Sequence, residues 1–352
     1  MIGWEDIYKV VVSMVPLYVP LVLGYASVRR WRMFKPEHCD AINRFNCYFV
    51  IPFFTFHFTS GVNPYRLNYQ FLAGDVVAKA IVGSILALWA NLWRGGNFSW
   101  AITSYSLSSL NNTLVVGVPL LGAMYGPVGE DLVVQSSVIQ ALIWFPILLF
   151  LLQLRQQQQK QKQQQEQQNA DQENQNGNTN ATAEYTTTVG STMIKVFAKL
   201  ATNPNCYACG LGLVWSLLAK RWNFGMPDIV EGSVLIMAKA GSGVAMFSMG
   251  LFMALQEKVI ACGVKMSLYG MLLRFVGGPL TTAIGSLALG LRSNILRIAI
   301  IQAALPEAIT AFVFAQEYGL HANVLSTAVI FGTIVSLPLL IAYYAILDVI
   351  KI

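Results

Sequence analysis

Apolar residues in this chain gather in runs of about twenty positions, separated by polar intervals. A run of that length can cross the hydrocarbon core of a bilayer as an α-helix. Ten such runs are expected, near 7–28, 40–60, 71–93, 100–124, 131–154, 198–219, 230–255, 260–290, 294–316 and 322–349. The pattern predicts an all-α polytopic membrane protein with ten transmembrane helices.

One polar interval is much longer than the others. Residues 155–192 are rich in Gln, Asn, Glu and Thr and cannot bury a core, which predicts a disordered loop. The loop would join a first five-helix repeat, residues 1–154, to a second, residues 193–352. Because five spans is an odd number, homologous halves would have opposite orientations. Segments 134–146 and 326–338 resemble each other and end on proline, which indicates inverted repeats.

Composition supports a membrane protein. Of 352 residues, 55% are hydrophobic and 11% are charged, with a mean hydropathy of +0.54. Soluble domains have about a quarter of their residues charged. With the N-terminus outside, twelve Lys and Arg residues fall on the inner side and seven on the outer side. Both termini are therefore predicted to be lumenal or extracellular and the central loop cytosolic. The net charge of +6 then reflects basic cytoplasmic loops rather than nucleic-acid binding.

Two of the apolar runs are interrupted. Segment 108–126 contains the adjacent amides Asn111 and Asn112, and segment 302–309 contains Pro306. Lipid does not tolerate exposed non-helical backbone, so such breaks line a cavity or are buried in protein. We expect the broken fourth and ninth helices to cross at mid-membrane and to form one substrate site. Helix N-termini at the breaks favour an anion. The alternative is that the two amides only cap broken helix ends.

Charged residues inside the apolar runs have several interpretations. Asp75 and Lys79 lie one helical turn apart, so they form either a structural ion pair or a polar cluster that supports the site. Glu307 directly follows the second break and could couple protons, cap a helix or face water. Lys239 and Arg274 are expected to extend toward the membrane surface.

The chain has no constellation typical of an enzyme. It lacks a phosphate-binding glycine loop, a metalloprotease motif and a nucleophile elbow, so we expect no catalysis, no metal and no cofactor. Cys206 and Cys209 form a Cys-x-x-Cys pair, which is either a redox or metal pair or two small helix residues. His57 lies among aromatic residues and is expected to pack against them.

Six strings, in order and with their spacing, identify a family. They are Val-Pro-Leu-Tyr at 15–18, Asn-Thr-Leu-Val-Val-Gly-Val-Pro-Leu at 112–120, Asn-Pro-Asn-Cys-Tyr at 203–207, Ala-Met-Phe-Ser-Met-Gly-Leu-Phe-Met-Ala at 245–254, Ile-Gln-Ala-Ala-Leu-Pro at 301–306 and Leu-Ser-Thr-Ala-Val-Ile-Phe-Gly at 325–332. With these strings the chain resembles the plant PIN-FORMED auxin carriers over nearly its whole length outside the central loop.

The resemblance implies ten spans in two inverted five-helix repeats, and a homodimer in the lipid bilayer. It also implies elevator-type carriage of indole-3-acetate or related aromatic carboxylates past a crossover of the fourth and ninth spans. The central loop has fewer than forty residues, which resembles the short-loop members associated with the endoplasmic reticulum. The expected location is therefore the endoplasmic-reticulum membrane, with the plasma membrane as the alternative.

Matched motif by motif, the resemblance implies substrate contacts, a supporting polar pair and a crossover. The substrate contacts are Asn112, Asn205, Gln140, Thr55, Val116 and Phe145; the supporting pair is Asp75 and Lys79; the crossover is Asn111, Pro306 and Glu307. The sequence departs from the family where Asn111 replaces a usual Pro, Glu307 a usual Gln and Phe145 a usual Tyr.

The expected function is transport of the indole-3-acetate anion out of the cytosol, into the lumen of the endoplasmic reticulum, without required ion coupling. Two alternatives stay open. One is a membrane receptor that binds auxin without transporting it, and the other is a sodium- or proton-coupled carrier of another organic anion.

Overall fold

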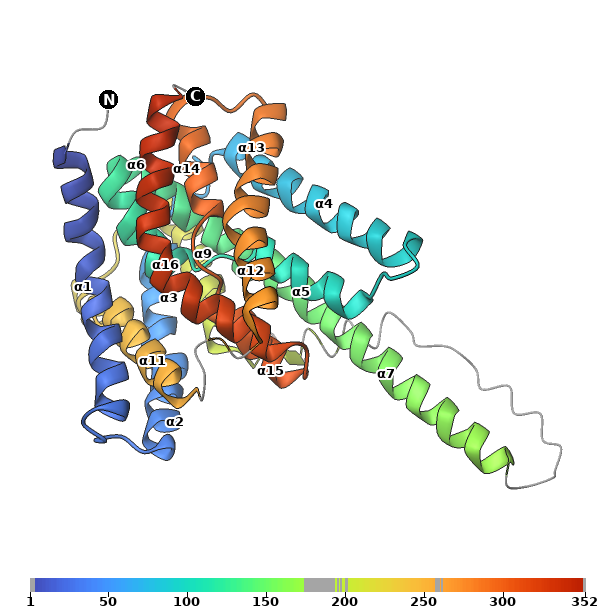
Figure 1. Ribbon diagram of the computed structural model, residues 1–352. Coiled ribbons are helices and arrows are strands. Elements are labelled where there is room, and N and C mark those ends of the chain that lie inside the picture. Colours follow the sequence, from blue (N-terminus) through green and yellow to red (C-terminus); the bar gives the residue numbers. More distant parts are fainter. Residues whose placement is uncertain are drawn as a thin grey trace.

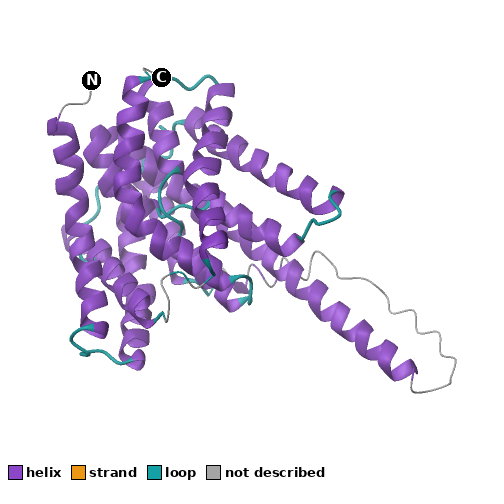
Figure 2. Cartoon of the chain, viewed as in Figure 1, coloured by secondary structure: helices purple, strands orange, loops and turns teal. Residues whose placement is uncertain are grey.

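The computed structural model describes residues 4–173, 194, 196, 198, 199, 202–256, 260 and 262–350. In this part of the chain the elements are helices joined by loops (Figures 1 and 2). The α-helices are α1 (Trp4–Arg29), α2 (Pro36–Phe45), α3 (Ile51–Gly61), α4 (Tyr69–Leu92), α5 (Phe98–Ser109), α6 (Val118–Ile139), α7 (Phe145–Glu173), α9 (Pro204–Trp222), α10 (Asp228–Lys239), α11 (Gly241–Leu255), α12 (Val264–Leu272), α13 (Gly278–Ala288), α14 (Ser293–Ala303), α15 (Ile309–Glu317) and α16 (Ala322–Val349).

Six helical stretches of the described residues are long and apolar enough to cross a membrane. They are Tyr8–Arg29, Tyr69–Leu92, Thr113–Lys160, Asp228–Leu255, Val264–Ala288 and Ala322–Val349. Helices also occupy the other predicted runs, but the number of ten spans remains a prediction. The 48-residue stretch bends at Gly126, whose φ of 63° is open to glycine without a steric cost.

Both predicted interruptions are present. Three residues separate α5 from the next helical segment, and five residues separate α14 from α15. Asn111 and Glu307 pair across the two gaps as an antiparallel bridge. The first break therefore forms without a proline, because each break gives backbone groups of the other a hydrogen-bond partner.

Four short π-helical segments continue into α-helices that begin close to a proline. They are η1 (Asn46–Val50), η2 (Thr113–Gly117), η3 (Gln140–Trp144) and η4 (Leu273–Gly277), and they end two residues before Pro52, Pro119, Pro146 and Pro279 respectively. Proline has no N–H group, and its ring clashes with the carbonyl four residues earlier, which a wider turn accommodates. In η4 that carbonyl belongs to Phe275 and accepts a hydrogen bond from the Tyr343 hydroxyl.

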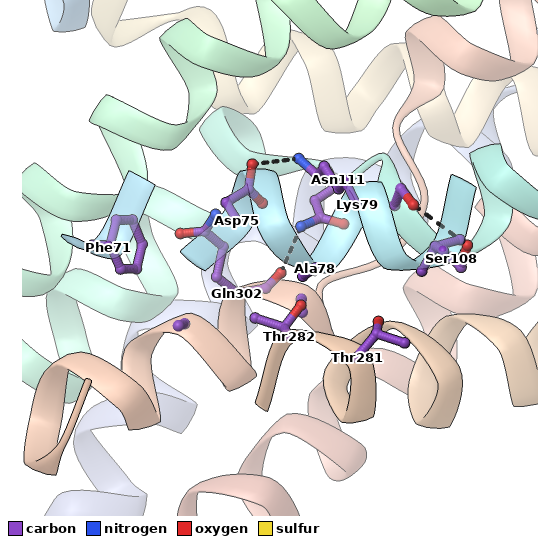
Figure 3. Close-up of a pocket in the computed structure, with 13 residues that line it drawn as sticks. Phe71, Asp75, Ala78, Lys79, Ser108, Asn111, Thr281, Thr282 and Gln302 are labelled. Carbon is purple, nitrogen blue, oxygen red and sulfur yellow. Dashed lines mark hydrogen bonds and ion pairs between the residues drawn. The ribbon is translucent and has the colours of Figure 1, made fainter. Parts of the chain in front are cut away.

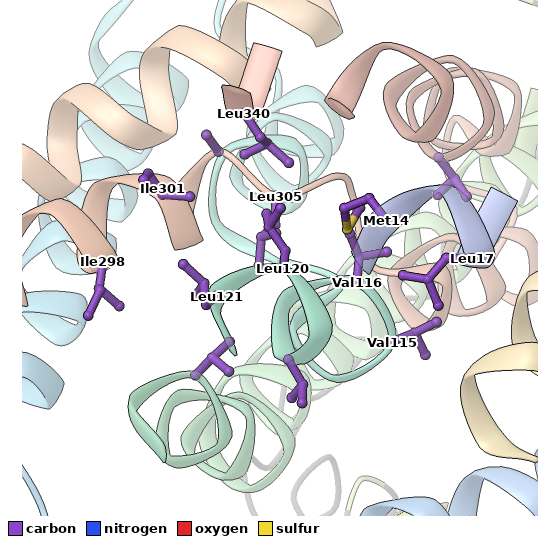
Figure 4. Close-up of a cluster of buried hydrophobic side chains, with 14 of the residues drawn as sticks. Met14, Leu17, Val115, Val116, Leu120, Leu121, Ile298, Ile301, Leu305 and Leu340 are labelled. Atoms are coloured by element: carbon purple, nitrogen blue, oxygen red, sulfur yellow. The ribbon is translucent and has the colours of Figure 1, made fainter. Parts of the chain in front are cut away.

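The helices pack in two groups. In the first group α1 lies along α11, and α3 packs against α9 and α10. In the second group α4 packs against α13, which also contacts α14, while α16 contacts α12 and α15. The groups meet mainly where α6 and η2 contact α1, α3 and α11 (Figure 1). Met14 of α1 packs there in one buried cluster with Val116 and Leu305 (Figure 4).

The predicted disordered loop, residues 155–192, begins as helix. α7 extends beyond the bundle to Glu173 (Figure 1). Residues 155–173 are mostly Gln and contain neither Gly nor Pro, so helix propensity is adequate there. The remainder of that loop, 174–192, and residue 193, the predicted start of the second repeat, lie outside the described residues.

Candidate functional site

The backbones of the two breaks contact each other reciprocally. The Asn112 N–H donates to the Pro306 carbonyl over 2.9 Å, and the Ala308 N–H donates to the Leu110 carbonyl over 3.1 Å. In each bond a residue of one break donates to a carbonyl of the other. This is the arrangement that a local two-fold relation between the breaks would produce.

The side chains of the breaks follow the same reciprocal pattern. Asn111 Nδ2 donates to the Gln302 carbonyl over 3.0 Å, and the Ser106 hydroxyl donates to Glu307 Oε1 over 2.9 Å. Each break residue thus reaches the helix that precedes the other break. Gln140 holds the Asn111 backbone from both sides: Oε1 accepts from the Asn111 N–H at 2.9 Å, and Nε2 donates to its carbonyl at 2.6 Å.

The two adjacent amides have different environments. Asn111 acts as a cap, because its side chain satisfies a carbonyl in the last turn of α14. Asn112 does not cap η2 with its side chain, and its buried Nδ2 has no hydrogen-bond partner among the described residues. Leaving a buried donor unpaired costs about 1–3 kcal/mol. The capping alternative therefore applies to Asn111, while Asn112 keeps a free donor at the crossover.

Arg274 is the residue that sequence reasoning placed wrongly. Its side chain is completely buried, not extended toward the membrane surface. The guanidinium donates to the carbonyls of Leu107, Leu110 and Leu305 and to Oδ1 of Asn111. These carbonyls lie where α5 and α14 end and so lack helical partners, and the five donors of an arginine fork can satisfy several of them.

A signal for Arg274 was present in the sequence. It lies ten residues after the start of the helical stretch at Val264, as Lys79 lies ten residues after the start of α4 at Tyr69. Both helices are the third predicted run of their half. An inverted repeat would therefore bring both cations toward the crossover.

Glu307 is completely buried, so the interpretation that it faces water is wrong. Its Oε2 atom lies 3.5 Å from Nη1 of Arg274. Glu307 provides no side-chain cap to α15, whose N-cap residue is Ala308. The carboxylate instead faces the guanidinium and the Ser106 hydroxyl.

Asp75 and Lys79 form a second ion pair, with 2.9 Å between Oδ2 and Nζ; Lys79 is buried and Asp75 is half-buried. Trp144 Nε1 donates to the same carboxylate oxygen over 3.1 Å, and its ring centroid lies 5.0 Å from the ammonium group. The pair lines a cavity of about 10 Å³ together with Asn111 and Gln302 (Figure 3). That space is close to the minimum for one water molecule, so it does not admit an aromatic acid in this conformation.

Thr55 and Asn205 lie together, but apart from the crossover. The Thr55 hydroxyl donates to Asn205 Oδ1 over 2.6 Å, between α3 and α9. Asn203 begins α9 by accepting from the Asn205 N–H at 2.9 Å. Among the described residues no hydrogen bond links Thr55 or Asn205 to either break. Of the predicted polar contacts, the structure brings only Asn112 and Gln140 to the crossover.

The two predicted apolar contacts are packed against protein. Val116 is buried in the cluster between η2 and α1. Phe145 is half-buried and meets Phe314 edge to face, with 6.1 Å between ring centroids. In this conformation Val116 leaves no space for a ligand ring.

A larger groove, of about 440 Å³, lies between α3, α6 and α11. Its volume falls in the usual range for small-molecule sites, about 300–1,000 Å³. The lining residues are Phe54, Phe58, Val118, Pro119, Gly122, Gly126, Pro127, Glu130 and Ser242. The groove begins at the first turn of α6, shortly after the first break.

The remaining candidates have structural environments. Cys206 and Cys209 lie in α9 as free thiols, and His57 meets Phe58 edge to face at 5.3 Å. Within the described ranges, no three His, Cys, Asp or Glu side chains come close enough to hold a metal ion.

Comparison with known proteins gives matches over the full chain. The family described as membrane transport protein matches residues 9–344. Auxin efflux carrier component 5 of Arabidopsis thaliana is 53% identical over 348 residues, covering 99% of each chain. Probable auxin efflux carrier component 5a of Oryza sativa subsp. japonica is 51% identical over 363 residues and 100% of each chain. Auxin efflux carrier component 8 of Arabidopsis thaliana is 39% identical over 366 residues, covering 99% of this chain and 100% of the relative.

These matches agree with the helices that are long and apolar enough to span a membrane. The family is one of membrane transporters and not of enzymes. The crossover described above lies inside the matched region. The chain therefore belongs to the PIN-FORMED family of auxin efflux carriers, as an integral membrane protein and a short-loop member of that family.

Proposed function

We propose that this protein transports the indole-3-acetate anion out of the cytosol, into the lumen of the endoplasmic reticulum, by an elevator-type mechanism. The names of its relatives support auxin as the substrate. The short central loop supports the endoplasmic reticulum, as in the short-loop members that the sequence resembles.

The observation that carries the proposal is the unpaired amide of Asn112 at the meeting point of two broken helices. η2 and α15 both begin there, so both N-termini present N–H groups and a positive dipole end to the same region. A carboxylate between them would receive hydrogen bonds from the Asn112 amide and from backbone donors. We assign the indole ring to the groove between α3, α6 and α11, where Phe54 and Phe58 are in the lining.

The division of the helices into two groups supports an elevator. α1, α3, α9, α10 and α11 would form a scaffold, and the helices that carry both breaks would form the moving unit.

The reciprocal bonds between the breaks support two inverted five-helix repeats and ten spans. In the moving unit, the ion pair of Asp75 and Lys79 would hold the crossover in position. Thr55 and Asn205 would meet the ligand only after a shift of one group along the other. A homodimer through the scaffold groups completes the proposal.

Flux of labelled indole-3-acetate into proteoliposomes tests the function. We expect uptake that does not require a sodium or proton gradient. Binding without flux would instead favour a receptor, and strict dependence on a cation gradient would favour a coupled carrier of another anion.

Asn112→Ala tests the site. A hydrogen bond to a charged group contributes about 1.5–3 kcal/mol, so transport should fall at least about tenfold. The melting temperature should not fall, because Nδ2 of Asn112 has no hydrogen-bond partner among the described residues. Asn91→Ala is the matched control, since it removes an exposed amide at the end of α4. Wild-type flux in the Asn112 variant would overturn the site assignment.

A further inference from the structure

Two ion pairs balance the charged side chains at the crossover. Oδ2 of Asp75 and Nζ of Lys79 lie 2.9 Å apart, and Nη1 of Arg274 and Oε2 of Glu307 lie 3.5 Å apart. Arg274 and Glu307 are both completely buried. Each cation has one carboxylate beside it, so these four side chains together present no net charge to an incoming anion.

Arg274 is fixed by its contacts with both breaks. Its guanidinium reaches carbonyls at the end of α5, the carbonyl of Leu305 after α14 and the side chain of Asn111. A side chain bonded to both interrupted helices cannot leave without releasing the crossover. Its positive charge therefore stays at the site.

Glu307 shares the crossover with the unpaired amide of Asn112. The residue before Glu307 is Pro306, whose carbonyl accepts the Asn112 N–H over 2.9 Å. Ser106 donates to one Glu307 oxygen, and Arg274 lies 3.5 Å from the other without a hydrogen bond to it; both partners favour the ionised carboxylate, while complete burial opposes it. In its ionised form Glu307 would therefore place a negative charge near a ligand carboxylate at Asn112.

We propose that Arg274 is the positioning residue of the crossover and that Glu307 is its internal counter-anion, which limits how strongly the site prefers carboxylate anions over uncharged analogues. The inference rests on the proposed function, because it takes the crossover as the ligand site. Removing the charge of Glu307 would leave one positive charge held at the crossover. Anion binding would then strengthen, while binding of an uncharged analogue would not.

The test compares indole-3-acetate with indole-3-acetamide, which has the same ring and no charge. Each compound competes against labelled indole-3-acetate uptake, and the ratio of the two inhibition constants is measured. In Glu307→Gln, the ratio should shift toward the anion by at least about tenfold, as expected for loss of one nearby charge in a buried site.

Three further variants separate charge from structure. Asp348→Asn removes the carboxylate of the Arg297–Asp348 pair at the end of α16, and should leave the ratio unchanged. Arg274→Gln combined with Glu307→Gln removes both charges and should return the ratio toward that of wild type. Arg274→Lys keeps the positive charge but loses the guanidinium that donates to several carbonyls. Transport should therefore fall, while the ratio of the two inhibition constants should stay that of wild type.

An unchanged ratio in a Glu307→Gln protein that still transports would overturn the inference. If that variant does not fold, Glu307→Ala removes the same charge and gives a second measurement of the ratio. Absence of uptake by the wild-type protein would overturn the proposed function instead, so the two failures are distinguishable.

Discussion

At the scale of single residues, the crossover depends on polar side chains that replace missing helix bonds. Gln140 is the simplest example, because one amide satisfies both the N–H and the carbonyl of Asn111. Gln140 is itself buried and lies in a π-helical segment. Its amide therefore holds the first break open at a fixed position.

Gln140→Leu should destabilise the protein and reduce transport. The change leaves two buried backbone groups of Asn111 unpaired, each at a cost of about 1–3 kcal/mol. A clear fall in melting temperature in detergent would report this cost. Gln70→Leu, at an exposed position of α4, is the control and should melt like wild type. Equal melting of both variants would contradict this account of the break.

Sequence reasoning located both breaks and the two adjacent amides at the first of them, but not the role of Arg274. Burying the charge of an arginine inside an apolar run is costly. Hydropathy therefore predicts that the side chain extends until its guanidinium reaches the membrane surface. The carbonyls that compensate this cost lie on two other segments, near residues 107–110 and 305. Their position follows from how three helices meet, which local pattern does not contain.

At the scale of helices, close packing depends on glycine where α1 and α11 cross. A Cβ atom on Gly250 would lie 2.1 Å from the Leu21 carbonyl oxygen, and one on Gly24 would lie 2.2 Å from the Phe247 carbonyl oxygen. The two backbones therefore touch, and a side chain at either position would have to separate the helices.

Gly250→Ala should lower the unfolding free energy by about 1–3 kcal/mol, the usual cost of overpacking. Thermal melting of the purified protein measures it. Gly243→Ala is the matched control in the same helix, because a Cβ atom there meets nothing within 4 Å. Alanine favours helix over glycine, so the control should be neutral or more stable. A stable Gly250 variant would exclude the direct backbone contact.

The positions of the helices were largely predictable from hydropathy, but their internal geometry was not. Apolar runs indicated where helices lie, and the helices occupy those runs. The π-helical segments depend on local backbone chemistry that hydropathy does not measure. The same holds for α7, which continues as a helix into the polar loop as far as Glu173. The predicted substrate contact Thr55 also lies apart from the crossover, because it belongs to the other packing group.

At the scale of the whole molecule, the two halves of the chain interleave. His321, between α15 and α16, stacks on Trp100 of α5 with 4.0 Å between ring centroids. Its Nδ1 lies 2.8 Å from the Thr103 hydroxyl. Arg155 of α7 donates to Ser99 of α5 nearby. The turn after α15 thus ties the second half to the first.

The contact of the His321 ring with α5 should make the stability of the protein depend on pH. Burial, with a smaller contribution from the charge of Arg155, lowers the pKa of His321 below its usual value. The unfolded chain then binds more protons than the folded one, so stability rises with pH and is lost as pH falls below about 6.5. We expect the melting temperature to fall from about pH 7.5 to about pH 5.

His321→Asn should flatten that pH dependence. Asparagine tolerates the positive φ of 43° at this position better than most residues. His38→Asn, at an exposed position of α2, is the control and should keep the slope of wild type. A slope that is the same in wild type and in the His321 variant would exclude His321 as its source.

The π-helical segments have a consequence for how the chain can change in length. Each segment contains one residue more than an α-helix needs for the same hydrogen-bonding path. Deleting one residue of η3, such as Ala141, would therefore restore regular α-helical turns and leave the helices on both sides in their present phase. The same deletion in a regular α-helical stretch would rotate one side by about 100° relative to the other. At these four points the chain can lose a residue without turning the rest of the helix, so chain length is less constrained there than in the regular helices.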